Sequence, residues 1–434
     1  MSDLAGQLDI HLHSAGNSPG AAIRSSRPLT AARVFAGKPL GTVGGQLPRL
    51  FSVCGMAQAM ASALACEAAL GCSPARSAAL ARGLLLRAET VKEHLWRLLL
   101  DWPNALARLD EGHVTGQLTA ATRVREAAVA TAMRAFLQLR GALTSRADPF
   151  LPGAAGVDLP RDALERACAS LVSTATEQIF RIAPADWLAE LGSTADLDRW
   201  AAQADTTAAV LVRALVQSGL AALGRCDIAT LPSGPGRGPA PGLLEVIAAA
   251  LASGAADDFI ASPLWHGQPA ETTPFSRELH RGGLVAAVTA AHGNGLLARL
   301  VALLAELARD CALLASAPLA SAPLGVPCPG PAVAALALAP GAATSVGLGA
   351  APAARGLLVH RLELMRDDTP ATTRVLGYRI LAPTEWNFHP AGVVATALAD
   401  IAAAEGLSTA EREARSRMVI TAVDPCVDYR LSVF

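Results

Sequence analysis

Apolar residues recur through most of the chain at intervals of three and four, the spacing that places them on one face of a helix. Glycine and proline interrupt this pattern and divide it into segments. The pattern predicts helices over residues 54–70, 74–100, 117–141, 161–181, 196–223, 242–253, 282–314 and 391–405. We therefore expect a protein in which helices dominate.

Alternation of apolar and polar residues, which is typical of strands, occurs near both ends of the chain. It predicts a short strand over Gln7–His13, a hairpin of Leu357–Leu364 and Val375–Leu381 around a polar loop, and a last short strand over Met418–Val423. The predicted fold class is α+β, predominantly α-helical, with small β elements at the N-terminus and in the C-terminal third. No internal repeat is evident, so we expect one domain over residues 1–434.

The segment from Cys311 to Ala354 contains no charged residue and is long enough to cross a bilayer. Seven prolines interrupt any continuous helix within it, and alanine is only weakly apolar. A membrane span is the alternative here. The prolines favour an uncharged Ala/Pro-rich loop over residues 311–354 that packs on the protein surface, with no membrane span.

The composition, the net charge and the spacing of the cysteines argue against some classes of function. Hydrophobic residues make up 52% of the 434 residues but aromatic residues only 4%, and the formal net charge is -1. Without a block of basic residues, nucleic acid is not an expected partner. The eight cysteines are scattered rather than arranged as a disulfide framework, and the first ten residues do not form a secretory signal. We expect a cytoplasmic protein.

Two cysteines stand out by their context. Cys54 precedes a predicted helix, whose first amide groups and dipole favour a thiolate, and Cys426 follows a proline that restricts the incoming backbone. Both are candidates to present sulfur to a ligand. The alternative is that each is a small buried hydrophobic residue. Neither has a partner at Cys-x-x-Cys spacing, so a closed structural zinc site is not expected.

Six segments resemble, in the same order, motifs of the large subunit of nickel–iron hydrogenases. Residues 50–57 (LFSVCGMA) look like Arg-x-Cys-Gly-x-Cys, and residues 424–429 (DPCVDY) look like the C-terminal Asp-Pro-Cys-x-x-Cys-x-x-His. Between them lie a helix with His94, residues 267–277 (GQPAETTPFSR), Arg355-Gly356-Leu357 with His360, and residues 383–387 (PTEWN). The resemblance covers nearly the whole chain and implies the large-subunit fold.

The departures from that family concern its metal ligands. The hydrogenases hold nickel and iron with four cysteines, and the second cysteine of each pair is replaced here by Ala57 and Tyr429. Alanine has no donor atom, and a phenol is a poor substitute for a bridging thiolate. The resemblance therefore implies that no nickel is bound and that the protein is not an enzyme. Ser432 stands at the position of the last histidine.

This pattern resembles the HupK-type hydrogenase expression and formation proteins. The resemblance implies an accessory role in hydrogenase maturation, with the large-subunit precursor and other maturation proteins as partners. It further implies a scaffold on which iron carrying cyanide and carbon monoxide is held transiently by Cys54 and Cys426. Arg355 matches a residue beside one cyanide and Thr384 matches a residue that contacts the other. Taken alone, a solvated arginine and a turn threonine are the alternatives.

The other matched residues have structural interpretations. We expect His94 to be a packed, hydrogen-bonded core histidine. Glu271 and Arg277 are expected to pair or to cap a helix near the site. Trp386 and Asn387 are expected to support the segment that carries Thr384.

Three functions are consistent with these residues. The first is the iron-binding scaffold. The second is a metal-free chaperone or placeholder that imitates the shape of the large subunit. The third is a divergent metalloenzyme, which would need new ligands in place of Ala57 and Tyr429; no residue spacing supports such ligands.

Overall fold

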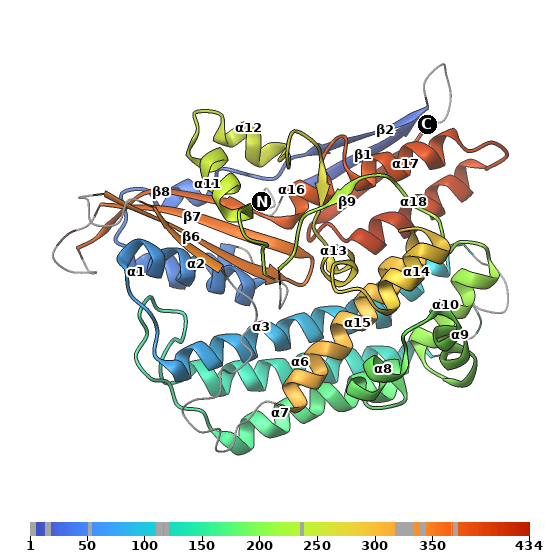
Figure 1. Cartoon of the computed structure of the whole chain (residues 1–434), viewed down its shortest axis with the longest axis horizontal. Helices are drawn as coiled ribbons and strands as arrows, with labels where there is room; N and C mark the ends of the chain where they lie inside the picture. The colour runs from blue at the N-terminus through green and yellow to red at the C-terminus, as the bar shows by residue number, and fades with distance from the viewer. Residues whose placement is uncertain are drawn as a thin grey trace.

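Long helices form one part of the molecule, and a four-stranded sheet with its covering helices forms another (Figure 1). The structure is a computed structural model that describes residues 6–13, 19–50, 54–109, 116, 121–234, 238–316, 334–338, 344–365, 367 and 372–434. The long helices that pack together are α3 (Arg76–Trp96), α6 (Thr122–Thr144), α7 (Arg161–Ala175) and α15 (Leu296–Ala315). The predicted α+β, mostly helical fold class is confirmed.

Helix α2 (Gly55–Leu70) lies between α3 and the four-stranded antiparallel sheet. The strand order is β5 (Ala334–Leu338), β6 (Thr344–Ala353), β7 (Gly356–Met365) and β8 (Arg374–Leu381). A Cβ atom on Gly349 would lie 2.1 Å from the carbonyl oxygen of Ala61, and one on Gly347 would lie 2.0 Å from that of Ala65. The helix and the strand thus meet backbone to backbone, which only glycine permits.

Replacement of Gly349 by alanine is expected to lower the free energy of unfolding by about 1–3 kcal/mol, because the new methyl group forces α2 away from β6. Urea unfolding measures the change. Gly141→Ala is the matched control: Gly141 is exposed in α6 with no atom near its added methyl, so a gain of about 0.5–1 kcal/mol is expected. Equal effects of the two substitutions would contradict the packing described.

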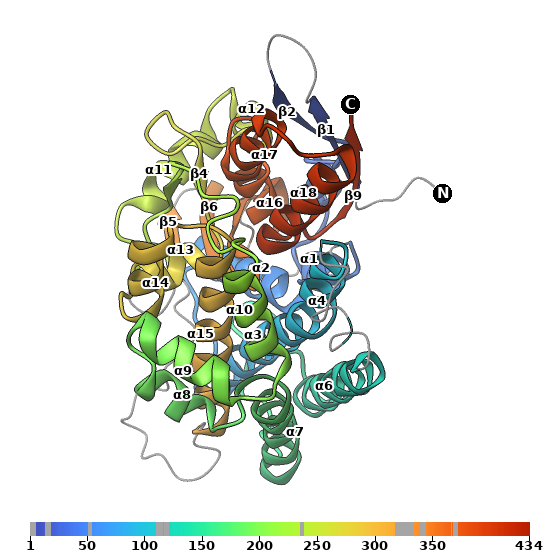
Figure 2. The same ribbon diagram turned by 90° about the vertical axis from the view of Figure 1, so that its right-hand side faces the viewer.

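A second sheet joins segments from the two ends of the described chain (Figure 2). Strand β1 (Gln7–His13) pairs antiparallel with β2 (Gly20–Ser25) and parallel with β9 (Asp428–Val433). Helix α17 (Val393–Ala403) packs on β1 and β2, and α18 (Thr409–Val423) packs on α17 and β9. The residues between α18 and β9, which include Cys426, are therefore anchored on both sides.

Shorter elements connect these layers. The helices are a 3-10 turn (Ala31–Phe35), α1 (Gly41–Leu50), two π-helical turns (Arg97–Asp101 and Thr176–Phe180), α4 (Trp102–Leu106), α8 (Pro184–Glu190), α9 (Thr194–Gln203), α10 (Thr207–Gln217), α11 (Leu243–Ala252), α12 (Ala256–Ala261), α13 (Pro274–Leu279), α14 (Leu284–His292) and α16 (Pro383–Asn387). The two-residue strands β3 (Ala229–Thr230) and β4 (Ala270–Glu271) pair in parallel.

Several boundaries predicted from the sequence are wrong. Met418–Val423 is not a strand but the end of α18, because a capping box at Ser408 and Glu411 starts a helix that continues through these β-branched residues. The single helix predicted over 196–223 is divided into α9 and α10, because the Thr206 side chain caps the second helix. The helix predicted over 282–314 is divided into α14 and α15 by the glycines at 293 and 295.

The predicted Ala/Pro-rich loop over 311–354 is also wrong in part. Cys311–Ala315 completes α15, and residues 334–338 and 344–353 are strands, while 317–333 and 339–343 lie outside the described residues. Glycine and alanine form a strand here because α2 packs so closely against it. Among the described residues, no helix is long and apolar enough to cross a membrane.

Candidate functional site

Cys54 lies at the N-terminus of α2, beside a carboxylate from α3. Glu89 accepts hydrogen bonds from the backbone amides of Met56 (2.9 Å) and Ala57 (3.0 Å). Burial, together with the charge of Glu89, raises the pKa of Cys54 to about 11. The expectation that free amides favour a Cys54 thiolate is therefore wrong, because the Glu89 carboxylate already occupies those amides.

Cys426 lies in a constrained segment between α18 and β9. Asp424 and Cys426 have positive φ angles of 65° and 61°, which are uncommon for residues other than glycine. Two hydrogen bonds hold this backbone: Cys426 N donates to Asp424 Oδ1 (3.3 Å), and the Thr384 hydroxyl donates to the carbonyl of Pro425 (2.7 Å). Such strain persists where the surroundings over-determine a conformation, and it is frequent at functional sites.

The two thiols share one electrostatic environment. Burial raises the pKa of Cys426; the nearby Arg355 lowers it, and the charge of a Cys54 thiolate raises it further. Burial lowers the pKa of Arg355, but the charge of Asp424 raises it, and charges on Cys426, Glu93 and Cys54 raise it further. The fold thus places Cys54, Cys426 and Arg355 close enough to influence one another, although they are widely separated in the sequence.

Arg355 occupies the tip of the hairpin formed by β6 and β7, where Ala353 pairs with Gly356. Gly356 (φ 145°) lies so close to the backbone of Thr272 that a Cβ atom added to this glycine would be 2.1 Å from the Thr272 carbonyl oxygen. The Asn387 amide donates to the carbonyls of Thr272 (2.8 Å) and Arg355 (3.2 Å). The predicted supporting role of Asn387 therefore extends to the segment that carries Arg355.

Ion pairs hold the Arg355 side chain in place. Its Nε donates to Asp424 Oδ2 (2.6 Å) and its Nη1 donates to Glu93 Oε2 (3.0 Å). Arg97 also pairs with Asp424 (3.1 Å), and its Nη2 donates to the carbonyl of Ala422 (3.0 Å) at the end of α18. Burial would raise the pKa of Asp424, but Arg355 and Arg97 lower it, so the carboxylate stays ionised. Helix α3, the hairpin and the C-terminal segment are joined through these charges.

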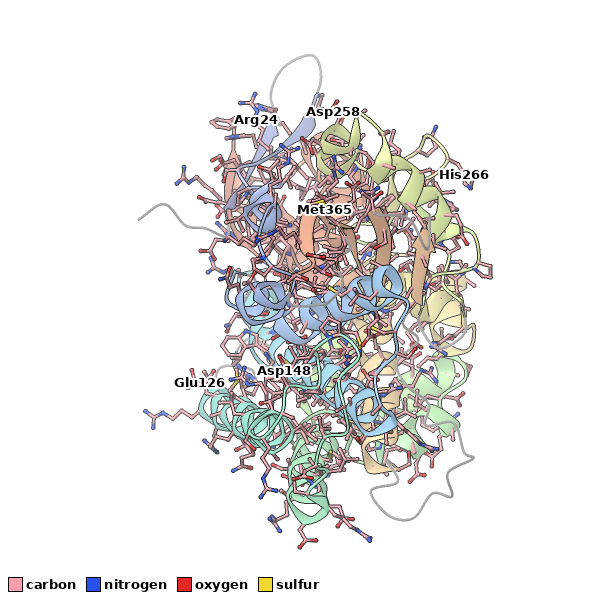
Figure 3. All side chains as sticks on the ribbon, turned by 90° about the vertical axis from the view of Figure 1, so that its left-hand side faces the viewer. Arg24, Glu126, Asp148, Asp258, His266 and Met365 are labelled. Atoms are coloured by element: carbon pink, nitrogen blue, oxygen red, sulfur yellow. The ribbon has the colours of Figure 1, made fainter. Side chains whose placement is uncertain are left out.

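A cavity of about 740 Å³ reaches Cys426, Arg355 and Asp424. Trp96, which is 42% exposed, and Tyr429 also line it. By contrast, the charged residues Glu126 on α6 and Asp258 on α12 are exposed at the surface (Figure 3). Within the described ranges, no group of three or more His, Cys, Asp or Glu side chains is arranged to hold a metal ion. The candidate site consists of two thiols next to a fixed guanidinium.

The remaining predicted residues lie in supporting positions. The prediction for His94 is confirmed: it is fully buried, and its Nε2 lies 2.8 Å from Glu306 Oε2. Glu271 and Arg277 do not pair with each other, because α15 supplies their partners, Arg299 for Glu271 and Glu306 for Arg277. Trp386 is buried in α16 beside Thr384 and Asn387, with the ring of Phe259 at 6.1 Å.

Sequence reasoning missed three residues of this site, two in α3 and one in the π-helical turn that follows it. Glu89, Glu93 and Arg97 lie four residues apart and so share one face of a helix. Three charged residues on one face usually indicate that this face is exposed to solvent, but here all three are buried. Glu89 bonds the start of α2, Glu93 pairs with Arg355, and Arg97 pairs with Asp424. The π-helical turn that begins at Arg97 is the kind of irregularity often found at functional sites.

A buried polar chain leads away from Cys54 into the core. Gln58 Nε2 lies 3.7 Å from Cys54 Sγ, and Gln58 Oε1 lies 2.8 Å from His360 Nε2. The other nitrogen of His360 bonds the Tyr378 hydroxyl (2.8 Å), whose oxygen lies 2.9 Å from Ser62 Oγ. Gln58 is thereby fixed by a network that reaches β7 and β8.

The neutral state of His360 predicts a pH dependence. Burial lowers its pKa from 6.5 to about 3, so at intermediate pH the unfolded chain takes up a proton that the folded chain does not. Below about pH 6.5 this residue therefore reduces the free energy of unfolding by about 1.4 kcal/mol per pH unit. Between pH 7 and pH 5 the free energy of unfolding, measured with urea, should fall by about 2 kcal/mol less in His360→Gln than in the wild type. Equal slopes would contradict a neutral His360.

The fold defines the class of protein. Solved structures similar to this chain include the reduced nickel–iron–selenium hydrogenase from Desulfomicrobium baculatum (TM-score 0.63, 13% identity, covering 98% of this chain and 97% of that chain). Another is the reduced nickel–iron–selenium hydrogenase from Desulfovibrio vulgaris Hildenborough (TM-score 0.59, 13% identity, covering 95% of this chain and 94% of that chain). The chain has the fold of the nickel–iron hydrogenase large subunit.

Closer relatives define the family. The hydrogenase expression/formation protein HoxV of Cupriavidus necator is 33% identical over 95% of this chain and 92% of its own length. The hydrogenase expression/formation protein HupK of Bradyrhizobium diazoefficiens is 30% identical over 94% and 90%. No protein-family model matches the chain. The chain belongs to the hydrogenase expression/formation proteins.

Proposed function

We propose that this protein is a non-catalytic accessory factor of hydrogenase maturation that holds iron with cyanide and carbon monoxide ligands. Cys54 and Cys426 bind the iron transiently, before the fragment passes to the large-subunit precursor. The observation that carries this proposal is that the segments bearing the two thiols and Arg355 meet although they are far apart in the sequence. Arg355 bonds Asp424, two residues before Cys426, and also Glu93 of α3. Glu89 of α3 in turn accepts from the two amides that follow closely after Cys54. Family membership supports the accessory role.

The donor set suits this cargo. Thiolates are soft ligands for iron, and the guanidinium of Arg355 balances their negative charge. Because burial raises the pKa of both thiols, loading the iron releases their protons. Ala57 supplies no ligand atom for nickel. The cavity against Cys426 gives the fragment a route to the partner proteins.

The roles of Arg355 and Thr384 toward cyanide stay predictions. Two nitrogens of Arg355 already bond Glu93 and Asp424, and the Thr384 hydroxyl hydrogen is donated to Pro425. We infer that their main task is to position Cys426. Contact with a cyanide nitrogen would use the remaining donor capacity of the guanidinium.

Complementation separates the scaffold from a metal-free placeholder. In a host that lacks this protein, the wild type should restore hydrogenase activity, whereas a Cys54→Ala, Cys426→Ala double variant should not. Cys72→Ala is the matched control, because Cys72 is a half-buried free thiol beyond the other end of α2. Full activity with the double variant would favour the placeholder. Failure of the Cys72→Ala control would instead indicate a general sensitivity to cysteine loss.

A further inference from the structure

The buried polar chain that begins at Cys54 has a fixed direction. His360 is fully buried and neutral, and a neutral imidazole has one nitrogen that donates a hydrogen bond and one that accepts. Gln58 Oε1 faces His360 Nε2 at 2.8 Å, and an amide oxygen can only accept. His360 Nε2 therefore carries the hydrogen and donates it to Gln58.

The far end of the chain agrees with this assignment. His360 Nδ1 has no hydrogen to donate, so it accepts the hydrogen of the Tyr378 hydroxyl at 2.8 Å. The Tyr378 oxygen can then accept from the Ser62 hydroxyl, at 2.9 Å. Each of Gln58, His360, Tyr378 and Ser62 is 3% exposed or less, so these hydrogen bonds are shielded from bulk water.

The amide nitrogen of Gln58 is the end of the chain that faces Cys54. While His360 holds the amide oxygen, Gln58 Nε2 lies 3.7 Å from Cys54 Sγ and donates a hydrogen bond to the sulfur. Gln58 follows Cys54 by four residues, about one turn of helix, so the two side chains lie on the same side of α2. Burial and the charge of Glu89 raise the pKa of Cys54, and the Gln58 hydrogen bond acts in the opposite direction.

A donor at this sulfur has a particular effect once Cys54 binds iron. A metal-bound thiolate carries no hydrogen, so it can only accept hydrogen bonds. Hydrogen bonds to metal-bound sulfur orient the ligand and withdraw electron density from it, and both effects tune the metal. The Gln58 amide is held in the orientation that such a thiolate requires.

We propose that Gln58 is a positioning residue, which holds the Cys54 sulfur by an N–H···S hydrogen bond and limits its electron donation to the iron fragment. His360 and Tyr378 keep the amide in the donating orientation. This inference rests on the proposed iron-binding function. A thiolate that donates less electron density forms a weaker bond to iron, which suits a cargo that must be passed on.

Infrared spectroscopy of the iron-loaded protein measures this electron donation. Gln58→Leu should shift the carbon monoxide band to lower wavenumber, because a more electron-rich iron weakens the carbon–oxygen bond. Met60→Leu is the matched control, since Met60 is a buried apolar residue of the same helix, and its band should stay in place. If Gln58→Leu fails to fold, Gln58→Glu gives the same test, because it keeps an oxygen for His360 and loses the amide N–H. An unshifted band in the Gln58 variant, or an equal shift in the control, would overturn the proposal.

The direction of the chain is tested without iron. Proton–nitrogen correlation NMR of the metal-free full chain, with isotope-labelled histidine, distinguishes the two tautomers, and His360→Gln identifies the His360 signals. The hydrogen is expected on Nε2. A hydrogen on Nδ1 would overturn the proposal, because Gln58 would then turn its NH2 group to His360 and its oxygen to Cys54. A wild type without infrared bands would overturn the proposed function and with it the effect on iron, whereas the tautomer still shows whether Gln58 donates to Cys54.

Discussion

Replacement of Glu306 by glutamine is expected to lower the free energy of unfolding by about 3–5 kcal/mol. Glu306 is fully buried, and its two carboxylate oxygens accept hydrogen bonds from Arg277 Nε and Nη2, each at 2.8 Å. Glutamine has nearly the same shape but no charge, so the Arg277 guanidinium would stay buried without a counter-ion. Urea or guanidinium unfolding, followed by circular dichroism, measures the loss.

Glu165→Gln is the matched control for this substitution. Glu165 pairs with Arg161 on α7, where both side chains are about half exposed, so the expected loss is below about 1 kcal/mol. A Glu306→Gln variant no less stable than Glu165→Gln would show that the buried pair between α13 and α15 does not stabilise the fold.

The second large effect is expected at Asp424. Asparagine tolerates the positive φ angle of this position but removes the charge that pairs with Arg355 and Arg97. Asp424→Asn should cost about 3 kcal/mol, because two buried guanidinium groups lose a shared partner while Arg355 retains Glu93. The segment that carries Cys426 should loosen, and Cys426 should then react faster with iodoacetamide.

Mass spectrometry of the alkylated protein measures that rate cysteine by cysteine. Asp428→Asn is the control, since Asp428 lies two residues beyond Cys426 with an exposed side chain. Equal alkylation rates of Cys426 in the two variants would mean that Asp424 does not hold this segment in place.

The helical part of the fold could be predicted because its apolar spacing is regular. Strand β6 could not, since its glycines and alanines lack the alternation typical of strands and are explained only by the close approach of α2. The prediction for Met418–Val423 was wrong for the opposite reason. Its β-branched residues are typical of a strand, but the capping box at Ser408 starts a helix that continues through them.

The candidate site was predictable only in part. The motif resemblance pointed to Cys54, Cys426, Arg355 and Thr384, and the structure brings the segments that carry them together. It did not reveal that Glu93, Arg97 and Asp424 form the charged frame around Arg355. These ion pairs join residues far apart in the sequence, so no local spacing reveals them.

Infrared spectroscopy of protein purified anaerobically from a hydrogenase-producing host tests the central claim most directly. Stretching bands of metal-bound cyanide and carbon monoxide should be present in the wild type and in Cys72→Ala, and absent from both Cys54→Ala and Cys426→Ala. Bands that persist in either of those two variants, or a wild type without bands, would contradict the claim that the two thiols hold the iron fragment together.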